Sequence, residues 1–186
     1  ASDSYYNGKG ELMTDYEWDA LFDQLKRLEE ETGEILPDSP TNRVSEDSIV
    51  GKKEEHEFAA LSLAKTKQVS DLVKWAEDRP IWISWKLDGL TLVVTYDGGK
   101  LTKIVTRGNG HIGTNITHLA PAISGIPATI SEKGHLVVRG EAVISYADFE
   151  QFIIESEGDY ANPRNLASGS LTLTDIEEVK QRHIQW

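Results

Sequence analysis

The feature that most constrains the fold is a pair of alternating runs joined by a tight turn. Residues 90–97 read LTLVVTYD and residues 100–108 read KLTKIVTRG, and both follow the period of two that is typical of strands. The Asp-Gly-Gly sequence at the junction is a hairpin signal. Residues 82–89 (WISWKLDG) and 135–145 (HLVVRGEAVIS) also have strand character. Connections this short predict a mostly antiparallel sheet.

Helical patterns accompany these strands. Thr14 and Glu17 have the spacing of a capping box, and apolar side chains follow at helical intervals until Gly33. Shorter helical patterns cover residues 69–78 and 145–156. The sequence therefore predicts an α+β fold, in which an amphipathic helix precedes the sheet.

The character of the chain changes once, near residue 45. Residues 37–44 read PDSPTNRV and contain two prolines, and the polar stretch that follows is typical of a linker or surface loop. We therefore expect two parts, a helical subdomain over residues 1–44 and an α+β domain over residues 45–186.

Composition excludes several functions. The 186 residues include 19 Lys and Arg against 31 Asp and Glu, which gives a formal net charge of −12. This charge repels the phosphate backbone, so autonomous binding to duplex DNA is not expected. The lack of cysteine excludes disulfides and thiolate metal sites. Without an apolar run of membrane-spanning length or a signal peptide pattern, we expect a cytoplasmic protein with no membrane contact.

Charged residues gather at the ends of three predicted strands. Lys86 and Asp88 are two residues apart and would point to the same side of a strand. The same parity joins Arg139 to Glu141, and Arg107 ends a third strand. Solvated salt bridges would explain any single pair. The convergence of all these charges favours a binding site.

The residue types indicate what such a site could do. A lysine amine is a nucleophile when it is neutral, and neighbouring cations lower its pKa. Arginines can hold phosphate oxygens and stabilise charge during attack on phosphorus. A carboxylate two residues away can bind a ribose hydroxyl or orient the amine. We therefore expect Lys86 to accept a nucleotidyl group, with Asp88 and Arg107 as further catalytic residues.

Several motifs resemble those of the covalent nucleotidyltransferases, a group that includes DNA ligases, RNA ligases and capping enzymes. Residues 86–89 look like the Lys-x-Asp-Gly motif of this group. Five further stretches resemble signature stretches of bacterial NAD-dependent DNA ligases, in the same order: PDSPTNRV, HEFAALSL, TRGNGHIGTNIT, VRGEAVIS and NPRNLASGSL. The resemblance implies that Lys86 forms a lysyl-AMP phosphoramidate. It also implies which residues line the AMP pocket and lie near the adenine: Asp88, Arg107, Glu141 and Arg164, with Ser62 and Leu63.

The resemblance further implies a role for the amino-terminal helix. Asp15, Trp18 and Asp19 share one helix face, and Tyr5 and Tyr6 precede them. The matching positions in the family grip the nicotinamide mononucleotide half of NAD. An aromatic face suits a cationic pyridinium, and carboxylates suit ribose hydroxyls. The residues alone also allow a structural role, in which the aromatic ring begins the apolar stripe and the carboxylates meet the helix dipole.

The first function we expect is that of a DNA ligase adenylation module. The family implies NAD and Mg²⁺ as cofactors, release of nicotinamide mononucleotide, and transfer of AMP to the 5′-phosphate of a nick. We assign no protein ligands to the metal. The later strand and lysine motifs of the family do not occur in the chain, so we expect an incomplete adenylation domain. Nicked duplex DNA would bind through modules absent from this chain.

An incomplete domain leaves two explanations open. The chain would be either a truncated piece of a ligase or one subunit of a split ligase, whose second subunit carries the later motifs. A second function, from another class, is a non-catalytic NAD-binding or assembly module. The intact charged motifs favour the enzyme, whereas Ser84, which stands where the family usually has an acid, favours the module.

Overall fold

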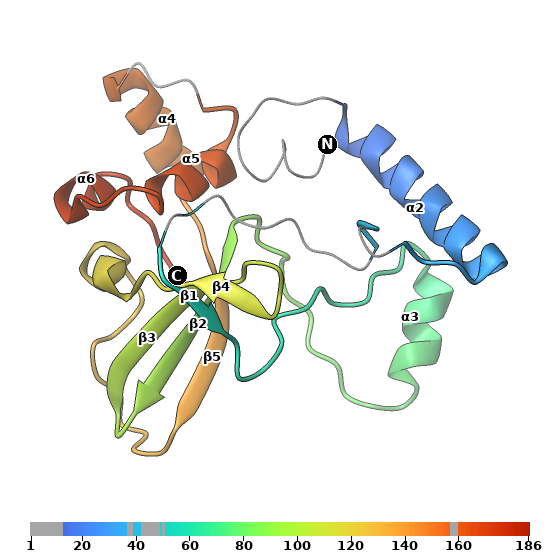
Figure 1. Ribbon diagram of the computed structural model, residues 1–186, viewed down its shortest axis with the longest axis horizontal. Coiled ribbons are helices and arrows are strands. Elements are labelled where there is room, and N and C mark those ends of the chain that lie inside the picture. The colour runs from blue at the N-terminus through green and yellow to red at the C-terminus, as the bar shows by residue number, and fades with distance from the viewer. Residues whose placement is uncertain (1–12, 37–38, 42–48, 50, 157–159) are drawn as a thin grey trace.

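The computed structural model describes residues 13–36, 39–41, 49, 51–156 and 160–186 (Figure 1). The described part is α+β with antiparallel strand pairs, as the sequence predicts. Its elements, in chain order, are α2 (Asp15–Thr32), β1 (Lys53–Glu55), α3 (Val69–Ala76), β2 (Leu90–Asp97), β3 (Lys100–Thr106), β4 (Ile112–Thr114), the 3₁₀ helix η1 (Thr117–Ala122), β5 (Leu136–Ala142), α4 (Tyr146–Ser156), α5 (Pro163–Ser170) and α6 (Ile176–Lys180).

Helix α2 begins and ends where the sequence predicts. The Thr14 side chain accepts a hydrogen bond from the Glu17 amide at 3.3 Å, and the Thr14 amide donates to Glu17 Oε2 at 2.9 Å. Gly33 ends the helix with φ 71°, a left-handed conformation that glycine adopts without a steric penalty. In the described part of the chain, no helix has both the length and the apolar character needed to cross a bilayer.

A three-stranded antiparallel sheet with the order β3-β2-β5 organises the second part of the chain. The β2–β3 hairpin follows the predicted turn, and β5 pairs with the other edge of β2, so that Thr91 lies opposite Glu141 and Val93 opposite Arg139. Strands β1 and β4 form a separate two-stranded sheet. The predictions of the hairpin, of the β5 strand and of helices α3 and α4 are confirmed.

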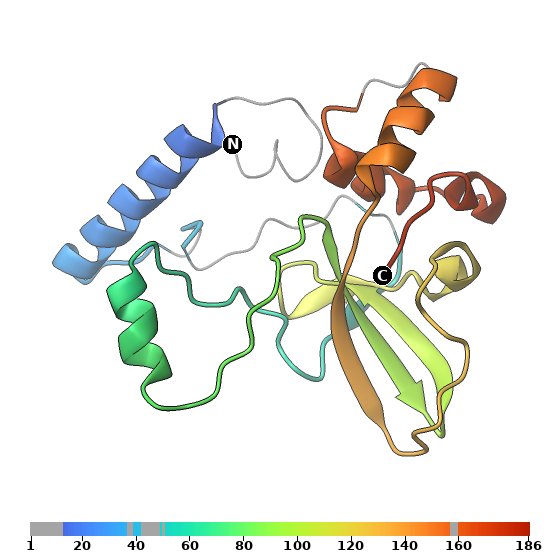
Figure 2. The ribbon, with the colours of Figure 1, turned by 180° about the vertical axis from the view of Figure 1, so that it is seen from behind.

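The main core lies against one face of the three-stranded sheet. The alternate β2 residues Leu92 and Val94 are fully buried, as is Ile104 of β3. They form one cluster with residues of η1, α5 and α6, such as Leu119, Leu166 and Val179. Figures 1 and 2 show helices α4 to α6 gathered on the side of the sheet away from α2 and α3.

The segment that follows α6 returns to the sheet. Gln185 exchanges backbone hydrogen bonds with Val143 at 2.8 and 2.9 Å, and the Trp186 amide donates to the Ser124 carbonyl at 2.9 Å. The Trp186 ring lies directly over Gly140 of β5. A Cβ atom at residue 140 would be 2.6 Å from ring atom Cε2, so only glycine leaves room for this ring.

The predicted strand over residues 82–89 is wrong. These residues have no regular secondary structure, and β2 begins only at Leu90. The side chains of Trp82, Ile83 and Trp85 are 100%, 88% and 91% exposed. The alternating pattern is present, but no other described strand pairs with this segment, and a strand requires a partner for its backbone groups.

Candidate active site

Arg107, just after β3, and Glu141, in β5, both contact Thr91 of the central strand β2. The Arg107 amide donates to the Thr91 carbonyl at 3.0 Å, and the Thr91 hydroxyl donates to Glu141 Oε2 at 3.0 Å. All three residues are partly buried. Sequence analysis did not single out Thr91, although its place opposite Glu141 follows from the strand pairing. The pairing therefore brings the Glu141 carboxylate and the backbone of Arg107 to the same β2 residue, Thr91.

Asp88 and Arg164 join two motifs that lie far apart in the sequence. Arg164 Nη1 lies 2.6 Å from Asp88 Oδ1, and the side chain of Arg164 is only 13% exposed. Helix α5 places this arginine in its first turn, because Asn162 caps the helix by accepting a hydrogen bond from the Asn165 amide at 2.9 Å. A mostly buried arginine side chain thus holds the carboxylate of the Lys-x-Asp-Gly motif.

Gly89 allows this part of the chain to pass close to β5. A Cβ atom at residue 89 would lie 2.1 Å from the carbonyl oxygen of Ala142. The glycine of the Lys-x-Asp-Gly stretch is therefore required by the neighbouring backbone, whatever else it does for a ligand.

Lys86 lies in the irregular segment that leads into β2, and its side chain is exposed. No hydrogen bond or ion pair of its amine is found within the described residues. The structure therefore brings Asp88, Arg107, Glu141 and Arg164 to the sheet that follows Lys86, and leaves the amine accessible.

The residues expected near the adenine lie on a segment bonded to the sheet edge. Arg139 Nη1 donates to the Leu61 carbonyl at 3.4 Å. The next two residues, Ser62 and Leu63, are exposed. The alternation of strand residues paired Arg139 with Glu141. The Arg139 guanidinium instead contacts the Leu61 carbonyl, in a segment without a helical or strand pattern.

The face of α2 that was expected to hold nicotinamide is partly described. The ring of Trp18 packs against Phe22 with centroids 5.7 Å apart. The carboxylate of Asp19 lies within ion-pair distance of Lys65 and Lys67, at 3.6 and 3.4 Å. Neither lysine was anticipated from the sequence.

Three of the expected nicotinamide contacts are not described. Tyr5 and Tyr6 lie outside the described residues, as does the side chain of Asp15. The backbone of Asp15 begins α2, one residue after its cap.

Comparison with known families agrees with the arrangement of these motifs. Residues 52–186 match the family described as the NAD-dependent DNA ligase adenylation domain. The chain belongs to this family. Residues 1–45 match the family described as the DNA ligase-like, N-terminal NAD⁺-binding domain.

Individual relatives are named DNA ligases. The chain is 47% identical over 180 residues to the DNA ligase of Lachnoclostridium phytofermentans, an alignment that covers 95% of this chain and 28% of that protein. It is 43% identical over 188 residues to the DNA ligase of Ruminiclostridium cellulolyticum, covering 99% of this chain and 29% of that protein. The chain thus spans less than a third of the length of these relatives.

The sheet of the adenylation domain also borders a cavity of about 300 Å³. Val93, Val105 and Val137 line it, and by strand parity they lie on the same sheet face as Arg107 and Glu141. The cavity therefore lies on the sheet face that also carries Glu141, although none of the expected site residues lines it.

A histidine bridge forms part of the lining of this cavity. His135 Nδ1 lies 2.5 Å from Asp97 Oδ1, and His135 Nε2 lies 2.7 Å from Glu57 Oε2. Hydrogen bonds to Asp97 and then to Glu57 raise the pKa of His135, and the hydrogen bond from His135 lowers the pKa of Asp97. The bridge connects β2 to the segment that leads to residues 61–63.

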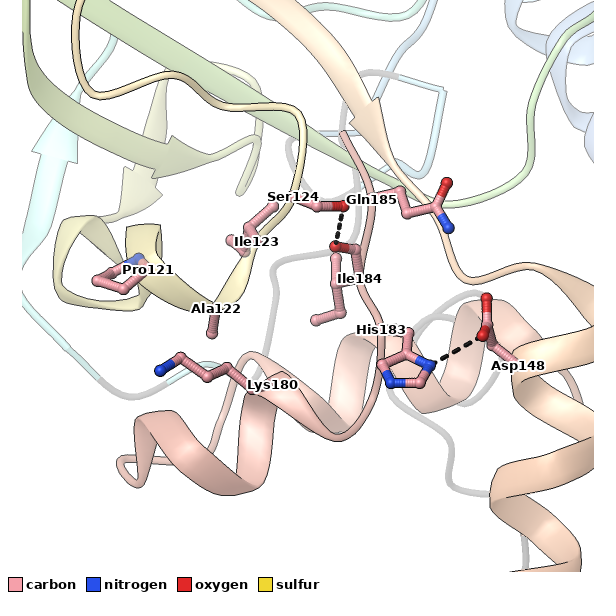
Figure 3. Close-up of a pocket in the computed structure, with 9 residues that line it drawn as sticks. All are labelled: Pro121, Ala122, Ile123, Ser124, Asp148, Lys180, His183, Ile184 and Gln185. Atoms are coloured by element: carbon pink, nitrogen blue, oxygen red, sulfur yellow. Dashed lines mark hydrogen bonds and ion pairs between the residues drawn. The ribbon is translucent and has the colours of Figure 1, made fainter.

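A second hollow of the adenylation domain, of about 470 Å³, lies beside η1, α6 and residues 183–185 (Figure 3). His183 Nδ1 lies 2.8 Å from Asp148 Oδ1 at its edge. None of the expected site residues lines this hollow, so we do not assign it to the nucleotide.

Metal ligands are few in the described part of the domain. No group of three or more His, Asp or Glu side chains there could hold a metal ion by itself. Asp88, whose carboxylate is 62% exposed, could supply a single ligand. This fits Mg²⁺, which usually combines one or two carboxylates with substrate phosphates and water.

Proposed function

We propose that this chain is the NAD-recognising and adenylating part of a DNA ligase. The observation that supports it best is the cluster beside Lys86, in which Arg164 holds Asp88 and Thr91 holds Glu141. A family defined by NAD-dependent adenylation accounts for these held acidic groups and for an exposed lysine two residues before Asp88.

The proposed step is a nucleotidyl transfer to Lys86. The neutral amine attacks the α-phosphorus of NAD, a P–N bond forms, and the amine gives up a proton. The P–O bond to the bridging oxygen breaks, and nicotinamide mononucleotide leaves with the electron pair. Arg107 and Arg164 carry the charge that develops on the phosphate oxygens. Asp88 orients the amine or binds a ribose hydroxyl.

The two halves of NAD are proposed to bind to the two parts of the chain. Ser62, Leu63 and Glu141 contact the adenosine, and Tyr5, Tyr6, Asp15, Trp18 and Asp19 contact nicotinamide mononucleotide. Mg²⁺, held by Asp88 together with phosphate oxygens, would neutralise phosphate charge. The AMP then passes to the 5′-phosphate of a nick in duplex DNA, and the proposed location of the reaction is the cytoplasm.

The test is a mass measurement after incubation with NAD and Mg²⁺. A preparation competent for adenylation should gain the mass of one adenylyl group, and Lys86→Met should abolish the gain. Lys74→Met, at an exposed position of α3, is the matched control and should retain it. An adduct of full yield on the Lys86 variant would overturn the assignment.

A second candidate is a non-catalytic assembly module. The exposure of Trp82, Ile83 and Trp85 beside Lys86 favours it, because apolar side chains around a nucleophile require a covering partner. The two candidates differ in what a covering partner does: if the chain is an enzyme, a polypeptide that covers this segment, such as a second ligase subunit, should allow the adduct to form. Failure of every such combination to form the adduct would favour the module.

A further inference from the structure

Two lysines in the segment that follows Ser62 and Leu63 form ion pairs with α2. Lys65 Nζ lies 3.6 Å from Asp19 Oδ1, and Lys67 Nζ lies 3.4 Å from Asp19 Oδ2, so each carboxylate oxygen faces its own ammonium. Lys65 Nζ also lies 5.6 Å from the centroid of the Phe22 ring, which is about one turn further along the helix. The contact therefore reaches two positions on one face of α2.

Local hydrogen bonds orient this segment. The hydroxyl of Thr66 donates to Asp71 Oδ2 at 2.9 Å and accepts from the Gln68 amide at 3.0 Å, which ties the residue between the lysines to the start of α3. The two flanking lysines both reach α2 instead. The two ammonium groups therefore face the same carboxylate, that of Asp19.

The charge of the partners explains why this contact forms. Acidic residues outnumber basic residues in α2, and the last turn of the helix contains no basic residue. The protein as a whole carries a formal charge of −12. Two ammonium groups offset this excess at the carboxylate of Asp19.

We propose that Lys65 and Lys67 are positioning residues for NAD. They hold Asp19, and with it α2, at a fixed place relative to Ser62 and Leu63, which lie a few residues before them in the chain. The inference rests on the proposed function, in which α2 and the adenylation domain bind the two halves of one dinucleotide. A carboxylate oxygen accepts more than one hydrogen bond, so Asp19 can keep both lysines and still accept from ribose hydroxyls.

The first test measures structure and needs no activity. Because the chain has no cysteine, spin labels can be placed only where cysteines are introduced, at Gln24→Cys in α2 and Asp78→Cys after α3. We expect a narrow distribution of label distances, which Lys65→Gln with Lys67→Gln broadens and Lys65→Arg with Lys67→Arg restores. Lys26→Gln with Lys74→Gln removes two other exposed lysines and should leave it narrow. An unchanged distribution in the first double variant would overturn the proposal.

The second test measures the use of NAD in a preparation competent for adenylation. Losing two exposed ion pairs should raise the KM for NAD by about 2- to 30-fold. Sealing of a nick that already carries AMP should be unchanged, and the arginine pair should restore the KM. Equal losses in both steps would point to a merely structural role and contradict the inference.

A third variant separates this inference from the function on which it rests. If Asp19→Ala impairs the step that consumes NAD while the glutamine pair does not, the proposed function stands and the lysines have no positioning role. If Asp19→Ala leaves that step intact, the proposed nicotinamide site is wrong.

Discussion

Single hydrogen bonds hold the acidic groups of the candidate site in place. Glu141 is held by the hydroxyl of Thr91, and Asp88 by the guanidinium of Arg164. Both contacts join residues that are far apart in the sequence: 50 residues separate Thr91 from Glu141, and 76 separate Asp88 from Arg164. The orientation of the site therefore depends on residues that strand pairing and helix capping bring together.

Thr91→Val tests the smallest of these contacts. The change keeps the shape of the side chain and removes the donor to Glu141, so the rate of lysyl-AMP formation should fall by about tenfold. The measurement is a time course of adduct mass with NAD. Thr102→Val makes the same change at the far end of the sheet and should leave the rate unaltered. A normal rate for Thr91→Val would show that the reaction does not depend on the hydrogen bond from Thr91 to Glu141.

The His135 bridge predicts a pH dependence of stability. Asp97 and Glu57 raise the pKa of His135 above its ordinary value of 6.5, so the protonated form is favoured in the folded state. Its contribution is fully present below about pH 6.5 and is lost as the pH rises through the raised pKa. Urea unfolding should therefore show His135→Asn less stable than the unchanged chain at pH 6, with the difference disappearing by pH 9.

A companion change locates the transition in that pH dependence. Glu57→Gln removes one of the two carboxylates, so the loss of stability should begin at a lower pH. A difference between His135→Asn and the unchanged chain that stayed constant from pH 6 to pH 9 would show that the bridge is not formed.

Sequence parity predicted part of this residue-level arrangement. It placed Arg139 and Glu141 on one side of β5 and Arg107 at a strand end, whereas the shared side of Lys86 and Asp88 depended on a strand that does not form, and Arg164 was named only through the family resemblance. It could not predict that Arg139 would contact the Leu61 carbonyl, because residues 56–63 follow neither a helical nor a strand period. The ion pairs of Lys65 and Lys67 were missed for the same reason. The roles of all these residues in binding NAD stay predictions.

Among the elements, α2 is joined to the chain after it by a buried acid. Glu29 is only 8% exposed, and it accepts hydrogen bonds from the hydroxyls of Ser39 and, at 2.5 Å, Thr41. This contact ties the end of α2 to the proline-containing stretch that follows. Within that stretch, the contact holds Ser39 and Thr41, although neither a helical nor a strand pattern predicts their position.

Glu29→Ala should therefore destabilise the fold. It removes the carboxylate that accepts from Ser39 and Thr41 and leaves these two hydroxyls only each other, with their oxygens 3.0 Å apart. Losing a buried charged acceptor in this way costs about 1–3 kcal/mol. Urea unfolding followed by circular dichroism would measure the change. Glu30→Ala alters the exposed neighbour in the same helix and should change stability by about 0.5 kcal/mol or less. Equal effects of the two substitutions would show that the contact contributes nothing.

Helices and strands were predicted correctly where capping or turn residues mark their ends. They were predicted wrongly where a strand could form only with a neighbouring strand to pair with. The capping box at Thr14 and the glycine at residue 33 correctly bounded α2, and the hairpin turn correctly joined β2 to β3. Residues 82–89 had the pattern of a strand without a described strand to pair with. Strands β1 and β4 were not predicted, because three residues are too few to show a period.

At the scale of the whole molecule, tryptophan exposure is the most accessible property to measure. Trp75, Trp82 and Trp85 are 63%, 100% and 91% exposed, whereas Trp18 and Trp186 are partly buried. Acrylamide should therefore quench most of the fluorescence of the 186 residues. Trp82→Phe with Trp85→Phe should remove most of the quenchable signal, and Trp18→Phe should not. Uniformly shielded emission would mean that residues 82–85 are covered.

The contact between Trp186 and Gly140 has a consequence for how the protein is made. The ring covers the middle of β5, yet the ribosome synthesises β5 well before it reaches residue 186. Because chains emerge from the amino end at a limited rate, that face of β5 stays bare while residues 141–186 are added. We therefore expect a chaperone that binds nascent chains to contact β5 until Trp186 has emerged and packed on it.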